Sequence, residues 1–548
     1  MRLLGYVFRQ SAGLLAFTVF AGSVAGVAAA GLISVIARSI SAKNGLVLIW
    51  PFVGLCLLTV IAGSLAGIAS IRLIQGAMYR MRVDLSRKIL ATRHATLQKI
   101  GRRELYTILN NDILMVTQSF QQMPFLLGQL VLLLACLVYM AWLSLSLFLP
   151  FVVLLGSTLA FYFALERIPF RKLVAMRVQL DDLNAALRDL IDGSRELQLN
   201  NDRANYFLSE VLSRQAALQR KLANDSLSLF ALVSTFGNIL FYLIMGVVLF
   251  AAPFWGQHPG AELTQFAFAL LYILGPIQVL TTSIQSLRNG EIALRRIELL
   301  DKTLPESGAD DARSDTRDPW TRAPSSLSLQ SVLYRYRDEL DELSYTLGPI
   351  DVELRSGEIT FIVGGNGSGK TTLGMLLLGL YEPMGGTILL DGVIVDSDNR
   401  DRYRQHFSAV FADFHLFEQL LQKDREAMDH RANAYIARFG LQSKVTADGG
   451  RFSTIKLSSG QRKRLALVAS FMEDRPIYLF DEWAADQDPE FKRVFYRELL
   501  PDLRARGKMV IVISHDDAYF DCADRVLRLG DGRLLDVEVD AARRAAAV

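Results

Sequence analysis

Charged residues and cysteines are both scarce in this chain of 548 residues. Asp, Glu, Lys and Arg make up 21% of it against 51% hydrophobic residues, and the mean hydropathy is +0.26. This apolar excess excludes a disordered chain and indicates a membrane protein with a soluble part. The balance of 59 basic and 56 acidic residues predicts no nucleic-acid partner. The cysteines form no C-x-x-C pair, which argues against a disulfide scaffold or a zinc ribbon: Cys56, Cys136 and Cys522.

Asp, Glu, Lys, Arg and His are absent from six long apolar runs in the first half of the sequence. Each run is close to the ~20 residues that cross a bilayer as a helix. The third and fourth runs nearly meet at Ser144, which predicts a tight hairpin. A proton-coupled carrier needs ionisable groups at membrane depth, so the energy for transport is expected elsewhere in the chain. The predicted spans are 12–37, 46–71, 124–143, 145–165, 228–252 and 264–284.

The segments between the spans differ in charge. Arg72–Gln122 and Arg167–Asn224 are long and rich in Lys and Arg, whereas Ala251–Ala261 contains neither. The positive-inside rule therefore puts both long segments, both termini and everything after residue 285 in the cytoplasm. Helix-forming residues with apolar positions three and four apart predict that the spans continue into the cytoplasm as extended helices.

Composition changes after residue 300. The stretch 301–326 is rich in Asp, Ser, Pro, Gly and Thr without periodicity, which predicts a linker. Short β-rich runs then alternate with helical stretches. The predicted organisation is an all-α transmembrane domain over 1–300, a linker over 301–326 and an α/β domain over 327–548.

A glycine-rich loop joins a predicted strand to a predicted helix. Strand Ile359–Val363 runs into GGNGSGKTT at 364–372, which fits the phosphate-binding pattern G-x-x-x-x-G-K-[ST]. A chance glycine-rich loop is the alternative, but it would not require a strand before it and a helix after it. Backbone N–H groups of such a loop converge on phosphate oxygens; Lys370 would reach the outer phosphates and Thr371 would bind Mg²⁺. The further ATP-binding candidates are Gly364, Asn366, Gly367, Gly369 and Thr372.

Two further buried-type strands end in polar residues. Ile477–Phe480 leads into Asp481 and Glu482, and Val510–Ile513 leads towards His515. Asp481 suits the Mg²⁺ shell, and Glu482 suits a general base that activates water. Because parallel sheets bind ligands at the carboxyl ends of their strands, we expect these groups to meet the glycine-rich loop.

The sequence LSSGQ at 457–461 resembles the signature L-S-G-G-Q of ABC transporters and lies about 20 residues before Asp481. Six spans followed by one such domain resemble a type IV ABC half-exporter. The resemblance implies that Tyr336 stacks on adenine, that Asp488 is the D-loop aspartate and that His515 is the switch histidine. It also implies that the signature completes the ATP site of a second copy in a homodimer, through Ser458, Gly460 and Gln461.

Several local motifs resemble the cyclic-peptide exporter branch, and within it the exporters of pyoverdine precursors. The resemblance implies ATP-driven export of a cyclic peptide, lipopeptide or peptide-siderophore precursor, such as an acylated pyoverdine precursor, from the cytoplasm to the periplasm. It also implies a lipid-embedded protein of the bacterial inner membrane that uses ATP and Mg²⁺. An importer on the exporter fold stays open, as does an ATP-gated channel or regulator. The motifs are GGNGSGK, DEWAADQDP, SHDD and GSRELQLN.

The sequence departs from the family pattern in several places. Ala412 stands where the Q-loop glutamine is usual, and the adjacent Asp413 is a candidate oxygen ligand for the metal. Ser459 replaces a signature glycine, and Asp486–Gln487 replaces Ala-Leu in the D-loop. The short stretch between Asp413 and the signature predicts a trimmed helical subdomain. Polar and aromatic residues of the spans that could line a cargo cavity, with helix packing as the alternative for each, are Phe236, Asn238, Phe241, Tyr242, Gln265, Tyr272 and Gln278.

Overall fold

The computed structural model describes residues 2–41, 45–255, 260–304, 319–335, 345–420 and 425–539. Its contacts divide the chain into a helical unit, Met1–Ser86 with Leu105–Thr303, and an α/β unit, Arg87–Glu104 with Leu304–Val548. The helical unit therefore differs from a simple N-terminal half, because the short segment Arg87–Glu104 makes its contacts with the α/β unit.

Six helices among the described residues are long and apolar enough to cross a membrane, which confirms the number of predicted spans. Ser144 has an extended backbone, with φ of −159°, and separates the third helix from the fourth as the predicted hairpin requires. The helices also run well beyond the apolar spans, as the periodic pattern predicted. They are α1 (Arg2–Ser41), α2 (Ile49–Ala91), α5 (Ile113–Leu143), α6 (Leu145–Asp192), α9 (Ser213–Trp255) and α10 (Gly260–Thr303).

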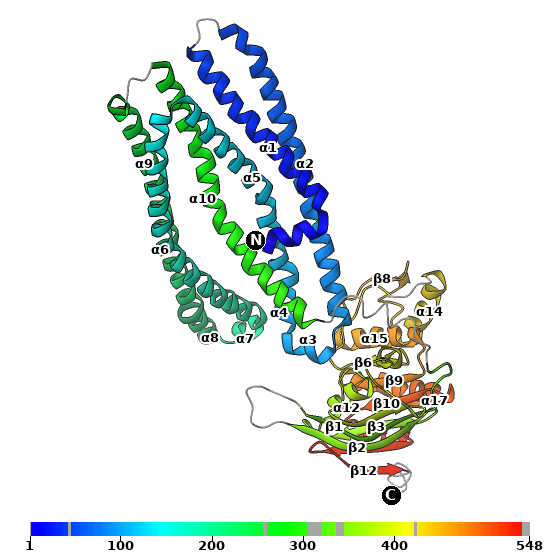
Figure 1. Ribbon diagram of the computed structural model, residues 1–548. Coiled ribbons are helices and arrows are strands. Elements are labelled where there is room, and N and C mark those ends of the chain that lie inside the picture. The colour runs from blue at the N-terminus through cyan, green and yellow to red at the C-terminus, as the bar shows by residue number, and fades with distance from the viewer. Residues whose placement is uncertain are drawn as a thin grey trace. The chain divides into compact units, whose positions relative to one another are not determined.

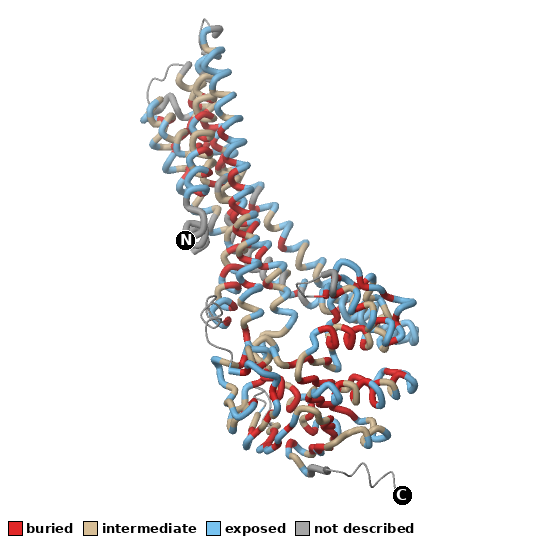
Figure 2. Tube along the Cα trace, turned by 90° about the vertical axis from the view of Figure 1, so that its right-hand side faces the viewer, coloured by how far each residue is buried: buried red, intermediate tan, exposed pale blue. Residues whose placement is uncertain are grey.

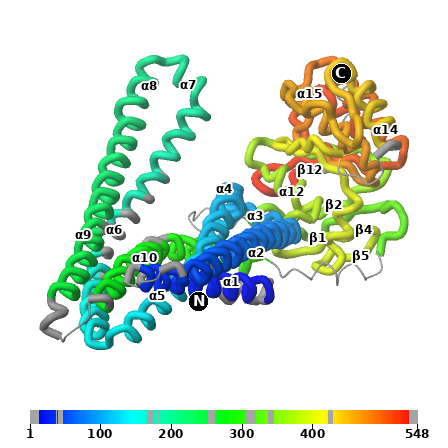
Figure 3. Tube along the Cα trace, turned by 90° about the horizontal axis from the view of Figure 1, so that it is seen from above, coloured from blue at the N-terminus to red at the C-terminus, as the bar shows by residue number. Residues whose placement is uncertain are grey.

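Short helical segments join the long ones. Figure 3 shows α7 and α8 at one end of the α6–α9 pair, where Asn200 caps α8 by accepting a hydrogen bond from the backbone N–H of Arg203. The short segments are η1 (Gly45–Leu48), α3 (His94–Ile100), α4 (Arg102–Thr107), η2 (Ile108–Asp112), α7 (Ser194–Gln198), α8 (Asn201–Tyr206) and η3 (Phe207–Leu212).

The helical unit has an apolar core and apolar outer faces. α6 packs along α9, and α10 packs along α5 and α1 (Figure 1). Met140, Phe151 and Phe266 are fully buried between these helices, whereas Trp50 is 80% exposed. Figure 2 shows the same division, with pale-blue exposed positions along the outer sides of the long helices. Uncharged outer faces of this kind suit the hydrocarbon of a bilayer.

A six-stranded sheet in the order β12-β11-β3-β10-β9-β6 forms the centre of the α/β unit. All pairs are parallel except that of β11 with β12. A second, antiparallel sheet has the order β2-β1-β4-β5. The strands are β1 (Ser326–Arg335), β2 (Thr346–Arg355), β3 (Ile359–Gly364), β4 (Gly385–Leu390), β5 (Val393–Ile394), β6 (Phe407–Val410), β9 (Ile477–Asp481), β10 (Met509–Ile513), β11 (Arg525–Gly530) and β12 (Arg533–Val539).

Both faces of the central sheet are covered. Phe361 of β3 and Phe480 of β9 enter one core, and Ile362 and Leu479, the next or preceding residues, enter the other. This alternation is the two-residue period of a strand, and burial on both sides explains the nearly continuous apolar runs in the sequence. The remaining elements are α12 (Lys370–Leu377), α13 (Arg400–Arg404), α14 (Arg425–Arg438), β7 (Ala447–Asp448), β8 (Arg451–Phe452), α15 (Ser459–Glu473), η4 (Trp483–Asp486), α16 (Pro489–Val494), η5 (Phe495–Leu499), α17 (Leu500–Ala505) and η6 (Asp517–Cys522).

Candidate active site

Three motif-bearing strands of the parallel sheet are direct neighbours, and a fourth lies beside them. β10 pairs with both β3 and β9, so Ile513 lies opposite Ile362 on one side and Asp481 on the other. β6 pairs with the other edge of β9. The segments that follow these strands therefore begin at one edge of the sheet, where open α/β sheets bind ligands. They carry the loop from Gly364, Asp481 with Glu482, His515, and Asp413.

The glycine-rich loop needs glycine at its two ends. Gly364 has φ of +155°, and a Cβ there would lie 2.3 Å from the carbonyl oxygen of Leu529. Gly369 has φ of +99°, and a Cβ there would lie 2.4 Å from the hydroxyl of Tyr345. Side chains at these positions would be both strained and blocked. Between them Asn366 and Gly367 are exposed, so this part of the loop backbone is open to a ligand.

Lys370 begins α12 and turns back into the loop. Its Nζ donates hydrogen bonds of 2.9 Å to the carbonyl oxygens of Gly364 and Gly365. Burial lowers the pKa of Lys370, while the carboxylates of Glu482 and Asp481 oppose that shift. A cation held inside the loop at a helix N-terminus attracts phosphate, and Thr371 and Thr372 follow it in the first turn.

Asp481 is a buried carboxylate with an unused oxygen. It is 3% exposed, and among the described atoms its Oδ1 has no hydrogen-bond partner. Burial raises its pKa to about 6, with the charges of Glu482 and Asp413 adding to the rise and Lys370 and a hydrogen bond from Thr371 opposing it. An unpartnered oxygen beside a hydroxyl fits Mg²⁺, which prefers hard oxygen ligands and takes few from the protein. No group of three acidic, His or Cys side chains suited to a metal occurs in the described residues, so phosphate oxygens would complete the shell.

Glu482 and His515 lie in contact. His515 Nε2 is 3.0 Å from Glu482 Oε1, and both side chains are partly exposed. Glu482 has φ of +48°, the left-handed region that side chains rarely adopt, and its N–H donates to the carbonyl of Ile513. Backbone strain of this kind concentrates at functional sites. The backbone conformation of Glu482 thus sets the direction of its carboxylate, and the imidazole of His515 contacts that carboxylate.

The signature residues form the N-terminal cap and the first turn of α15. Ser458 is the N-cap, and its side chain and that of Gln461 form a capping box. The carbonyl of Gly460 accepts a hydrogen bond of 3.0 Å from Gln487 of the D-loop. Asp488 caps α16 through the N–H of Phe491; this bond, with the nearby Arg464, holds the pKa of Asp488 below its usual range. The signature and the D-loop are therefore joined by a direct hydrogen bond.

The expected adenine partner, Tyr336, lies outside the described residues. Two positions earlier, Tyr334 stacks on Tyr381 with ring centroids 5.0 Å apart. Stacking of Tyr336 on adenine stays a prediction.

One element of this unit was not foreseen from the sequence. Helix α3 contacts the segment after α12: the hydroxyl of Tyr381 donates to Gln98 Oε1 at 2.7 Å, and His94 stacks on the same ring. Beside it Glu382 pairs with Arg93 and with Arg400. Burial raises the pKa of Glu382, but the hydrogen bonds and charges of the two arginines together lower it by more, so the net pKa is below its usual value. Nothing local in the sequence signals a contact across nearly three hundred residues.

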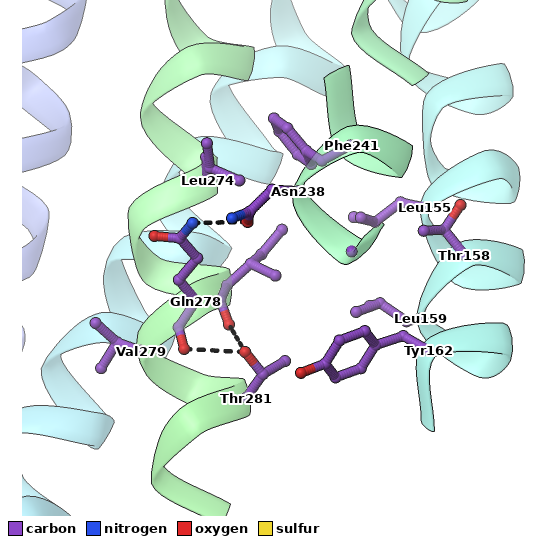
Figure 4. Close-up of a pocket in the computed structure, with 12 residues that line it drawn as sticks. Leu155, Thr158, Leu159, Tyr162, Asn238, Phe241, Leu274, Gln278, Val279 and Thr281 are labelled. Atoms are coloured by element: carbon purple, nitrogen blue, oxygen red, sulfur yellow. Dashed lines mark hydrogen bonds between the residues drawn. The ribbon is translucent and has the colours of Figure 1, made fainter. Parts of the chain in front are cut away.

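The helical unit contains a cavity of about 410 Å³ between α6, α9 and α10. Asn238, Phe241 and Gln278, all expected from the sequence, line it, and Gln278 Nε2 donates to Asn238 Oδ1 at 2.7 Å (Figure 4). Tyr162 extends towards the same space from α6. Among the described lining residues none carries a charge.

The other four expected cavity residues lie elsewhere. Tyr272 lines a separate cavity of about 440 Å³. Gln265 accepts a hydrogen bond of 3.2 Å from Tyr139, so it joins α10 to α5. Phe236 and Tyr242 have aromatic neighbours in Phe161 and Phe241.

These features define a multi-pass membrane protein that carries a nucleotide-binding domain. Similarity to known proteins supports this assignment. The family model described as "ABC transporter" matches residues 347–485. The ATP-binding protein SyrD of Pseudomonas syringae pv. syringae is 36% identical over 532 residues, with 94% of this chain and 93% of that protein covered. The chain therefore belongs to the ABC transporter family, in which ATP hydrolysis is coupled to transport. An ATP-dependent lipid A-core flippase of Methylobacillus flagellatus is 27% identical over 387 residues, covering 66% of this chain and 62% of its own.

The fold has a solved counterpart. A bacterial Atm1-family ABC exporter with ATP bound superimposes with a TM-score of 0.75 at 19% identity, covering 98% of this chain and 96% of that one. This likeness over nearly the full length confirms the predicted fold class, six apolar helices followed by an α/β nucleotide-binding domain.

Proposed function

We propose that this protein uses ATP to export a cyclic peptide, a lipopeptide or a peptide-siderophore precursor, such as an acylated pyoverdine precursor, from the cytoplasm to the periplasm. It acts as a homodimer in the bacterial inner membrane, with the α/β unit in the cytoplasm. The observation that carries the proposal is the pairing of Glu482 with His515 at the strand ends, in a chain that also holds an uncharged membrane cavity. The motifs of the cyclic-peptide exporter branch support the cargo class.

The chemistry is hydrolysis of the outer phosphate of ATP. Lys370 and the exposed loop N–H groups would bind the phosphates, and Thr371, Asp481 and Asp413 would hold Mg²⁺ through their oxygens. When bound, the ion neutralises charge on the phosphate oxygens. Glu482 accepts a proton from the attacking water, and His515 holds the Glu482 carboxylate in position. Ser458, Gly460, Gln461 and Asp488 of the second copy close the site.

The cargo site is the cavity between α6, α9 and α10. Its volume lies within the range of about 300–1,000 Å³ typical of ligand pockets. Leu155, Leu159 and Phe241 suit apolar groups, while the amides of Asn238 and Gln278 can exchange their mutual hydrogen bond for bonds to a peptide. Charged groups would enter without a partner of opposite sign, so the part of the cargo held here is neutral.

The test is ATP hydrolysis by the full chain in lipid nanodiscs, with and without candidate cyclic and acylated peptides. Wild type is expected to hydrolyse ATP and to be stimulated by one peptide class. Glu482→Gln is expected to lower kcat by about 100-fold or more, because the base is lost while ATP binding remains. Wild-type turnover no faster than that of Glu482→Gln would contradict the proposed chemistry.

Direction is tested separately in inside-out vesicles. ATP-dependent accumulation of the stimulating peptide inside such vesicles supports export. ATP-dependent loss of preloaded peptide would instead support an importer on the exporter fold. Stimulated hydrolysis without movement in either direction would favour the ATP-gated channel or regulator.

A further inference from the structure

Residues at which the sequence departs from the ABC pattern lie together in the structure. Ser459 stands in place of a signature glycine, and Asp486 and Gln487 stand in place of Ala-Leu in the D-loop. The hydroxyl of Ser459 donates to Asp486 Oδ2 at 3.4 Å. Gln487 Nε2 donates to the carbonyl of Gly460 at 3.0 Å. Ser459, Asp486 and Gln487 therefore belong to one connected set that joins the signature loop to the D-loop.

A buried lysine is the centre of this set. Lys463 Nζ lies 2.9 Å from Asp486 Oδ2, and its side chain is only 6% exposed. Its Nζ also approaches the carbonyl oxygen of Glu482 at 3.4 Å, and its own carbonyl accepts a hydrogen bond from buried Trp483. The hydrogen bond and charge of Lys463 hold the pKa of Asp486 below its usual range. A buried ammonium needs such a partner, so the pair fixes both loops.

Gln487 adds an uncharged connection. It is 7% exposed, and both ends of its amide are bonded, because Arg464 Nε donates to Gln487 Oε1 at 2.9 Å. Arg464 in turn pairs with Asp488 and lies over the ring of Phe491 at 4.0 Å. The first turns of α15 are thus joined to the D-loop by two ion pairs and several hydrogen bonds that do not involve nucleotide.

We propose that Ser459, Lys463, Asp486 and Gln487 form a clasp that orders the signature loop before ATP is bound. The inference rests on the proposed function, in which this loop completes the ATP site of a second copy. A loose loop would lose conformational entropy when the two copies close on ATP, and that loss would weaken binding. A loop already held against the D-loop avoids it. Lys463 and Asp486 are therefore positioning residues that act through Ser458, Gly460 and Gln461.

The test compares Asp486→Ala with wild type in two measurements on the full chain in nanodiscs. The KM for ATP is expected to rise about threefold to tenfold while kcat changes by less than about twofold. The reason is that the signature loop of the variant would become ordered only when ATP binds. Hydrogen exchange in 457–461 without nucleotide is expected to speed up by a similar factor. Asp486→Glu, which keeps the carboxylate, is expected to restore part of both.

Asp474→Ala is the matched control. Asp474 pairs with Lys508 at 2.9 Å with similar exposure of the carboxylate, 56% against 53% for Asp486, but contacts neither motif. It is expected to leave the KM for ATP and the exchange of 457–461 as in wild type. If both alanine variants raised the KM for ATP and the exchange of 457–461 equally, a general loss of stability would explain the effect, and the proposal would be overturned.

Other outcomes are equally decisive. A fall in kcat at unchanged KM, or unchanged exchange in 457–461, overturns the proposal. Should Asp486→Ala fail to fold, Ser459→Ala removes the hydroxyl and keeps the Cβ, and it is expected to give a smaller change of the same sign. The exchange measurement needs no hydrolysis, so it tests the clasp even if wild type shows no Glu482-dependent activity and the proposed function fails.

Discussion

At the scale of a single residue, the proposed magnesium ligand Asp481 has a cost to the stability of the fold. The carboxylate is buried, one oxygen is without a hydrogen-bond partner in the described structure, and its pKa is raised to about 6. The folded protein therefore holds the proton more tightly than the unfolded chain, in which an Asp titrates near about 3.9. The stability that the protonated carboxyl contributes is present below that value and is lost as the pH rises through about 6.

Asp481→Asn should accordingly stabilise the nucleotide-free protein while ending hydrolysis. We expect a gain on the order of 1–3 kcal/mol near about pH 7.5, because the amide carries no charge to bury. The gain should shrink by about half near pH 5, where the wild-type carboxyl is largely protonated. Thermal unfolding of the full chain in nanodiscs, with a chelator present, measures it.

Asp401→Asn is the control for this prediction. Asp401 is a surface carboxylate paired with Arg404, so its substitution should give no gain at either pH. A gain in Asp481→Asn that is independent of pH would show that the charge of the carboxylate is not its cause.

At the scale of the element, α3 makes its contacts with the α/β unit although it lies between membrane spans in the sequence. Tyr381 contacts α3 through a hydrogen bond to Gln98 and through stacking of its ring on His94. Arg102, at the start of α4, reaches Asp413 at 3.4 Å, but both side chains are exposed, so that ion pair contributes little. Buried Tyr381 is thus the firmer connection between α3 and the rest of the α/β unit.

Tyr381→Phe is expected to weaken coupling and spare hydrolysis. It removes one hydrogen bond, worth about 0.5–1.5 kcal/mol, and keeps the ring that stacks on Tyr334. Stimulation of hydrolysis by the cargo peptide should fall about twofold to tenfold, with basal hydrolysis unchanged. Tyr435→Phe, which removes a hydroxyl bonded to Arg506 in the same unit, should leave stimulation intact. Equal losses in the two variants would show that α3 is not the connection.

The elements differ in how far the sequence predicted them. The six spans and the strands around Gly364, Asp481 and His515 were predictable, because hydrophobic runs and phosphate-loop chemistry leave local patterns. Their meeting at one sheet edge followed from parallel pairing. The docking of α3 and the union of Ser459 with Asp486 were not predictable, because each depends on contacts between residues far apart in the chain.

At the scale of the whole molecule, the proposed homodimer would complete the ATP site. Each chain has one phosphate loop and one signature, and the signature residues Ser459 and Gly460 hydrogen-bond to their own D-loop. An isologous pair related by a two-fold axis would place each signature against the other chain's loop. The exposed position Asn366 of one copy would then face Ser459 of the other.

A cysteine pair tests this arrangement in the full chain. Because the natural sequence has only three cysteines, they can be replaced before Asn366→Cys and Ser459→Cys are introduced together with Glu482→Gln. Oxidation in nanodiscs with ATP and Mg²⁺ is expected to give a covalent dimer, since a disulfide requires the two Cβ atoms to come within about 4.5 Å. Each single-cysteine variant should remain a monomer on a denaturing gel, because the two-fold axis brings neither position against itself. Dimers from a single variant, or none from the pair when ATP binding is retained, would contradict a head-to-tail homodimer and leave Ser458, Gly460 and Gln461 without their proposed role.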